Sequence, residues 1–184
     1  MQIITSNKNN ISFNVQVARL HEAITKADIG LGTSSYPIVI NNFVTINDPD
    51  LYNFCPGETI SITLIDTIIN PEAPRLDLEV VSCRLLNIGQ EFNNSENTLA
   101  NPWSGVFNLN TNNIVIASDG SLSITPENNA CSITVSEDPN ESSKTTFVSY
   151  SILLKSKVLL STDTVKVFYF LIDPLIKVTS GGRG

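Results

Sequence analysis

The chain has little of the side-chain chemistry on which enzymes rely. Its 184 residues include one histidine and three cysteines, and only 16% of them are charged. Nothing near the histidine, His21, completes a Ser-His-Asp or Cys-His arrangement in the sequence. The two acids Asp77 and Glu79 share one strand face, and we interpret them as solvated positions of that strand. We therefore expect no enzymatic activity, no small-molecule substrate and no cofactor.

Basic residues are also scarce. The chain has 11 lysines and arginines against 18 aspartates and glutamates, and its formal net charge is −7. A protein that binds nucleic acid directly needs clustered lysine and arginine against the phosphates, and this chain offers no such cluster. Its polar surface comes instead from asparagine, serine and threonine. Such a neutral surface suits packing against other proteins.

The three cysteines, Cys55, Cys83 and Cys131, fit no metal-ligand spacing, so we expect no metal site. Their odd number argues against a closed disulfide framework. One disulfide plus a free thiol stays open, because β-sandwiches sometimes bridge their two sheets. The favoured interpretation is three buried thiols in a protein made in a reducing cytoplasm.

The sequence also lacks the marks of a membrane or exported protein. No apolar run approaches the length of a membrane span. Residues 1–10 lack the basic start and apolar stretch of a secretory signal. We expect a protein that is cytoplasmic, released by lysis, or a mature form whose signal has been removed.

What the chain does contain is a series of short β-branched and aromatic runs, separated by asparagine, serine, aspartate, glycine and proline. The runs predicted to be strands are 11–17, 59–64, 114–117, 122–124, 131–135, 147–153 and 165–171. Helical spacing of apolar residues occurs once and predicts a short helix over 16–28. We predict an N-terminal arm, strand and helix over 1–35, a β-sandwich over 36–178 and a tail over 179–184.

Several connections carry turn signals. Asn41-Asn42 lies between two short β-runs and predicts a tight turn or a bulged strand. Asp119-Gly120 predicts a type I′ hairpin turn, and 157–162 a hairpin between the last two long strands. Asp48-Pro49-Asp50 is interpreted as a plain turn, because a calcium site needs six or more oxygen ligands. The run 168–171 is apolar on both faces, which predicts a central strand or one covered on both sides.

The longest stretch without strand character, 87–104, is a candidate functional or interfacial loop. Trp103, the only tryptophan, lies at its end. The ring is either an exposed binding anchor or a plug packed beneath the loop. The candidate interface residues are Asn93, Asn94, Trp103 and Arg183.

The stretch 56–64, the segments 105–109 and 113–116, and the run 130–135 together resemble immunoglobulin-like β-sandwich modules, including cadherin-like and bacterial Ig-like repeats and modules of tailed-phage virion accessory proteins. The resemblance covers roughly 56–178. It implies an all-β fold, an antiparallel Ig-like or Greek-key sandwich. The residue patterns above add one short N-terminal helix and extended terminal arms to this fold. The chain departs from these families because it lacks cadherin-like calcium motifs and the Cys…Trp…Cys order of antibody domains.

These observations predict a non-enzymatic structural protein of a virus particle, made in the host cytoplasm: a tailed-phage accessory, decoration or connector component. Its partners would be other virion proteins and copies of itself, without direct nucleic-acid or membrane contact. The arm 1–10, the loop 87–104 and the tail 173–184 would reach neighbouring subunits. The alternative is a secreted or cell-surface Ig-like binding module of the carbohydrate or adhesin type, which needs an exposed aromatic platform.

Overall fold

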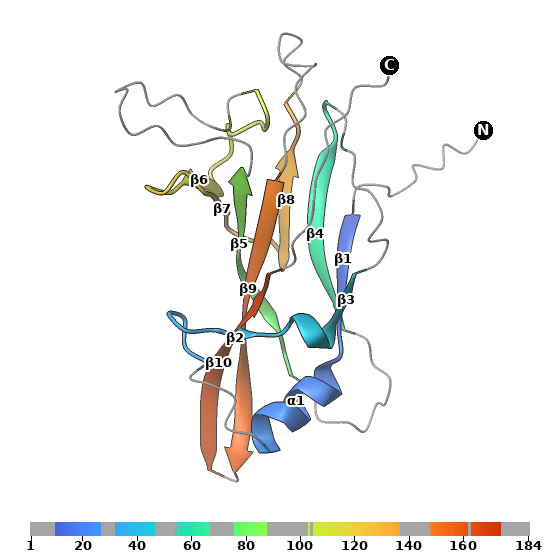
Figure 1. The fold of residues 1–184 in the computed structure, drawn as a ribbon, viewed down its shortest axis with the longest axis vertical. Helices are drawn as coiled ribbons and strands as arrows, with labels where there is room; N and C mark the ends of the chain where they lie inside the picture. The colour runs from blue at the N-terminus through green and yellow to red at the C-terminus, as the bar shows by residue number, and fades with distance from the viewer. Residues whose placement is uncertain are drawn as a thin grey trace, which may run out of the picture.

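Two β-sheets packed face to face make up most of the structure, a computed structural model (Figure 1). The residues that the structure describes are 10–26, 32–46, 54, 56–66, 76–87, 103, 105–136, 148–161 and 163–173. Among these residues, no helix is long and apolar enough to cross a membrane.

The strands follow the predicted β-branched runs closely. Their bounds are β1 Asn10–Val15, β2 Ile38–Val39, β3 Val44–Ile46, β4 Thr59–Asp66, β5 Glu79–Asn87, β6 Ile114–Ile116, β7 Leu122–Ile124, β8 Ala130–Thr134, β9 Val148–Ser161 and β10 Thr164–Ile172. The four-stranded sheet, here called sheet A, has the order β3-β1-β4-β8. The six-stranded sheet B has the order β2-β10-β9-β5-β7-β6. The prediction of an all-β sandwich is confirmed at this level.

The prediction that the sandwich is purely antiparallel is wrong, because each sheet contains one parallel pair. In sheet A, β1 runs parallel to β4, with Ile11 opposite Ile62. In sheet B, β2 runs parallel to β10, with Ile38 opposite Phe170. Parallel neighbours need a crossover connection, which adjacent strands of a simple hairpin do not have. Strand periodicity carries no information about the direction of a neighbouring strand.

The inward faces of both sheets share one hydrophobic core. In β1 and β4 every second residue is apolar, so Phe13 and Ile62 point inward while Asn14 and Thr63 lie on the other face. The ring of Phe13 in sheet A meets that of Tyr150 in sheet B edge-on, with centroids 5.7 Å apart. This contact spans the space between the sheets and is favourable for aromatic rings.

The one α-helix among the described residues, α1, spans Val17–Lys26 and confirms the predicted helix. Its buried residues Val17, Leu20 and Ile24 belong to the same core as the strands. β1, which precedes the helix, is an interior strand of sheet A. The N-terminal strand and helix therefore contribute side chains to the core that the two sheets share.

The segment around Asn41-Asn42 is not a tight turn within one sheet. A short 3₁₀ helix, η1 (Asn41–Phe43), carries the chain from β2 in sheet B to β3 in sheet A. The side-chain Oδ1 of Asn41 accepts a hydrogen bond from the backbone N–H of Asp173 at 2.9 Å. Polar asparagine therefore serves here to tie a crossing segment to the end of β10.

The type I′ turn occurs at a different place from the one predicted. At Asp119-Gly120 only Gly120 has a positive φ, 77°, and the N–H of Ala117 donates to the C=O of Ser121. This is a three-residue loop built on a type I turn, with glycine in the left-handed position. Asn128 and Asn129 both have positive φ, 50° and 62°. They form the two-residue turn that passes from β7 in sheet B to β8 in sheet A.

The last two strands are joined more tightly than predicted. β9 continues through residues 157–161, so only residues 162 and 163 separate it from β10. β10 lies between β2 and β9, and its inward residues Phe168 and Phe170 are buried. Its outward side is not fully covered, since Val165 and Val167 are exposed. The prediction of a strand covered on both faces is therefore correct for the inner face only.

Candidate interaction surface

Trp103 is the one predicted interface residue that the structure describes, and its side chain is fully buried. The indole packs against the ring of Phe107, with centroids 5.7 Å apart. It is therefore a core residue, and its interpretation as an exposed binding anchor is wrong. Asn93, Asn94 and Arg183 lie outside the described residues, as do the loop 88–102 and the Asp48-Pro49-Asp50 segment.

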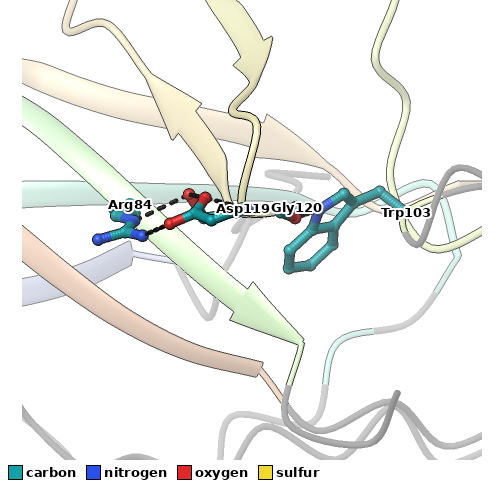
Figure 2. Close-up of polar contacts among 5 residues, drawn as sticks. Arg84, Trp103, Asp119 and Gly120 are labelled. Atoms are coloured by element: carbon teal, nitrogen blue, oxygen red, sulfur yellow. Dashed lines mark hydrogen bonds and ion pairs between the residues drawn. The ribbon is translucent and has the colours of Figure 1, made fainter. Parts of the chain in front are cut away.

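Trp103 instead belongs to a brace that fixes the β6–β7 turn against β5 (Figure 2). Its Nε1–H donates to the C=O of Gly120 at 2.9 Å. From β5, the Nε–H of Arg84 donates to the hydroxyl of Ser121 at 2.8 Å, and its guanidinium pairs with the carboxylate of Asp119. The turn is therefore bonded from inside by the indole and from outside by the arginine.

The electrostatics of the brace favour a charged Asp119. The hydroxyl of Ser121 donates to the Asp119 carboxylate at 2.7 Å, and the backbone N–H of Ser121 donates to it at 3.1 Å. These two bonds, and then the charge of Arg84, hold the pKa of Asp119 below its ordinary value of 3.8. Asp119 and Arg84 are both about half exposed, so the ion pair itself contributes little to stability.

The outward face of sheet B carries an exposed apolar patch. We define the outer patch by Val39, Leu159, Val165 and Val167, which are 58%, 58%, 61% and 42% exposed. Register places Leu159 directly opposite Val165 on β9 and β10. Val39 lies on the same face, on β2 opposite Leu171, which is four residues along β10 from Val167. An apolar group gathered on one sheet face marks a surface that gains free energy when another molecule covers it.

Basic side chains border the outer patch on β9. Lys157 pairs with Val167 in the register, and Lys155 lies two residues further along the same face. Lys155 makes an ion pair with Glu79 of β5 at 2.8 Å, which lowers the pKa of Glu79 and raises that of Lys155. The patch thus presents apolar groups beside lysines on a protein whose net charge is −7.

β6 forms the described edge of sheet B farthest from the outer patch. The N–H of Ala117 donates to the C=O of Ser121, and the C=O of Asn113 accepts from the N–H of Thr125, at the two ends of β7. Alternation along an antiparallel strand therefore turns the backbone N–H and C=O of Ile116 towards the open edge. Val115 is 60% exposed beside it. An apolar edge strand of this kind accepts pairing from another chain, and the brace holds it in place.

The outward face of sheet A is mostly polar, although Ile65 of β4 is 42% exposed there. Hydroxyl groups face one another across β4 and β8: Thr59 lies 2.9 Å from Thr134, and Ser132 donates to Ser61 at 3.3 Å. Thr63 donates to the side chain of Asn10 on β1 at 3.0 Å. These side chains satisfy one another, so this face offers few strong contacts to a partner.

The candidate acids do not form a catalytic arrangement. Asp77 and Glu79 are both exposed; Glu79 is the first residue of β5 and bonds to Lys155, while Asp77 lies before the strand. His21 is half-buried on α1. Across the described ranges, no three histidine, cysteine, aspartate or glutamate residues gather closely enough to hold a metal ion.

Sequence reasoning missed the outer patch, although a signal was present. The run 168–171 is apolar on both faces, which predicted a central strand or one covered on both sides. The other possible meaning is an apolar face that nothing in the chain covers. Residues at the exposed positions, such as Val165 and Val167, differ in no way from buried valines in a strand pattern.

Comparison of the chain with models of protein families, with curated proteins and with solved structures gives no match.

Proposed function

We propose that this protein is a non-enzymatic structural component of a virus particle, an accessory, decoration or connector protein of a tailed phage, which acts through protein–protein contacts. The observation that carries the proposal is the outer patch: Leu159 and Val165 stand exposed and opposite each other on adjacent strands. Covering such a surface gives affinity without any catalytic side chain.

Two further features support binding as the activity. The lysines beside the outer patch favour an acidic partner, and electrostatic complementarity of this kind directs orientation and the rate of association. The β6 edge offers backbone groups for strand addition by a neighbouring chain. In a particle with many copies, several weak contacts of this sort add up to a stable assembly.

The proposal includes an Ig-like topology for the sandwich, with copies of the chain and other virion proteins as partners. Two sheets around a single core agree with this topology. The parallel pairs β1–β4 and β2–β10 would then be elaborations at the N-terminal end of the chain.

The test is to purify particles from the native source and to look for the chain by mass spectrometry and electron microscopy. A structural component is present in a fixed number of copies per particle and remains bound after repeated sedimentation. A chain that mass photometry shows as a monomer, and that never sediments with particles, would contradict the proposal. Recovery from the cell surface or medium would instead favour the secreted binding module.

A further inference from the structure

Two cysteines face each other across the core of the sandwich. Cys83 lies on β5 of sheet B and Cys131 on β8 of sheet A, and their residues are 0% and 1% exposed. Both are free thiols in this structure. Each occupies an inward position of its strand, since Cys131 pairs with the buried Ile62 and Cys83 with the buried Ile152. The expectation of buried thiols is confirmed for this pair, while Cys55 lies outside the described residues.

The thiol of Cys131 reaches across to the strands around Cys83. Its Sγ lies 3.7 Å from the backbone oxygen of Ile124 on β7. Ile124 is the residue directly opposite Cys83 in the β5–β7 register. The sulfur of Cys131 in sheet A therefore contacts the backbone of Ile124, the strand neighbour of Cys83 in sheet B.

A second contact fixes the approach of the two strands. Asn129, two residues before Cys131, accepts a hydrogen bond from the backbone N–H of Val80 at 2.6 Å. Val80 lies three residues before Cys83 on β5. Together with the Cys131 contact, this bond holds β8 against β5, and Cα atoms of the two strands come within 8 Å. A disulfide joins Cα atoms about 4.4–6.8 Å apart, so closure requires β5 and β8 to bring Cys83 and Cys131 into this range as the sheets pack.

We propose that Cys83 and Cys131 are a cross-linking site, at which a disulfide joins sheet A to sheet B when the chain folds in the presence of a disulfide oxidant such as oxidised glutathione. One protein thiolate attacks a glutathione disulfide and releases one glutathione thiolate, which leaves a mixed disulfide. The second protein thiolate attacks the protein sulfur of that bond and releases the second glutathione. Two protein thiols are oxidised, and one glutathione disulfide is reduced to two thiols.

The disulfide forms while the chain folds, and not in the protein once it is folded. Burial raises the pKa of Cys83 well above its ordinary range and that of Cys131 to about 11, so few thiolates exist at neutral pH in the folded chain. The thiolate is the reacting form, and a thiol in apolar surroundings is inert. Before β8 packs on β5, both thiols titrate normally and are open to the oxidant.

The test uses the full chain, reduced, unfolded and refolded in a glutathione redox buffer, with free thiols then alkylated in denaturant. Trypsin places the three cysteines on separate peptides, 27–75, 76–84 and 85–144. The expected result is a mass for 76–84 linked to 85–144, lost on reduction, with 27–75 alkylated. Links that involve Cys55, or alkylation of all three cysteines, would overturn the proposal.

Variants and a native-state arm complete the test. Cys55→Ala keeps the link, whereas Cys83→Ala and Cys131→Ala each abolish it and leave the remaining partner alkylated. The linked wild type melts roughly 10 °C above the reduced chain. Oxidised glutathione added to the folded, reduced protein gives no link over hours, and rapid linkage there would contradict the role of burial. In protein from its native source, a closed bond indicates folding in an oxidising compartment.

Discussion

The two sheets share one core, but their outward faces are built differently. Sheet A shows serine, threonine and asparagine side chains that bond to one another across neighbouring strands, such as Thr59 with Thr134. Sheet B shows exposed valine and leucine beside lysines, as at Leu159, Val165 and Lys157. The polar side chains of the first face bond to one another, and Ile65 is exposed beside them. The second face gains free energy only from cover by another molecule.

The difference also extends to how firmly each sheet is held. The free edge of sheet B at β6 adjoins a turn that is braced by Trp103 and Arg84 (Figure 2). A binding surface loses less free energy on association when it is ordered beforehand. The brace lies at the β6 end of sheet B and the outer patch at the β2–β10–β9 end, so sheet B offers a braced edge and an apolar surface at two separate places.

The most direct way to break the brace of sheet B is Trp103→Ala. We expect it to reduce the free energy of unfolding by about 3–5 kcal/mol, because it empties a fully buried ring site. Trp103→Phe keeps most of the ring but removes the bond to Gly120, and should cost less. Urea unfolding followed by circular dichroism measures both. Equal losses in the two variants would mean that the hydrogen bond, and not the packing, dominates.

The outer patch is tested by the double variant Leu159→Lys and Val165→Lys. Partner binding or self-association should weaken at least tenfold, about 1.4 kcal/mol, because two charges now occupy the apolar surface. The control is Thr45→Lys on sheet A, an exposed strand position that should leave binding unchanged. Sedimentation velocity or binding to purified particles measures the effect. If the control weakens binding as much as the double variant, the two faces do not differ as described.

The pH dependence of the brace is tested by Asp119→Asn. Because its pKa in the folded chain lies below its ordinary value of 3.8, Asp119 contributes stability above that pH. The contribution is lost as the pH falls through the lowered pKa. We expect wild type and variant to approach each other in stability below pH 3.8 and to differ most near neutrality. Melting temperatures across pH 2–7 show this, and a constant difference would contradict it.

The smallest effect is expected on sheet A, from Thr134→Val. The hydroxyl pair with Thr59 is exposed, and β-branched valine suits a strand as well as threonine does. The free energy of unfolding should change by less than about 0.5 kcal/mol. Chemical denaturation is sensitive enough to detect a larger loss, and such a loss would show that the hydroxyl contacts do more than solvate this face.

Local signals predicted the elements well and their partners poorly. Alternation in 59–64 and helical spacing in 17–27 depend on which face of an element is buried, and both were correct. The direction of β1 against β4 depends on residues about fifty positions apart, and nothing local encodes it. The turns show the same limit, since Asn128-Asn129 adopts positive φ and Asp119 does not. The Asp119-Gly120 turn also receives hydrogen bonds from Trp103 and Arg84, which lie elsewhere in the sequence.

The candidate site was less accessible to prediction than the fold. Trp103 is chemically suited both to an exposed anchor and to a core, and only the packing with Phe107 and Gly120 assigns it to the core. The sequence could not distinguish the outer patch from a buried strand face, because the exposure of a side chain depends on which other segments of the chain pack against it.

By itself, the sequence determined that the chain forms short strands around a core, with one helix after the first strand, because side-chain periodicity follows directly from backbone geometry. Only the tertiary structure decided which strands are neighbours, which apolar residues stay exposed and which two cysteines lie in the shared core. Those outcomes depend on contacts between segments far apart in the chain. The same local pattern of apolar and polar residues is compatible with many different sets of such contacts.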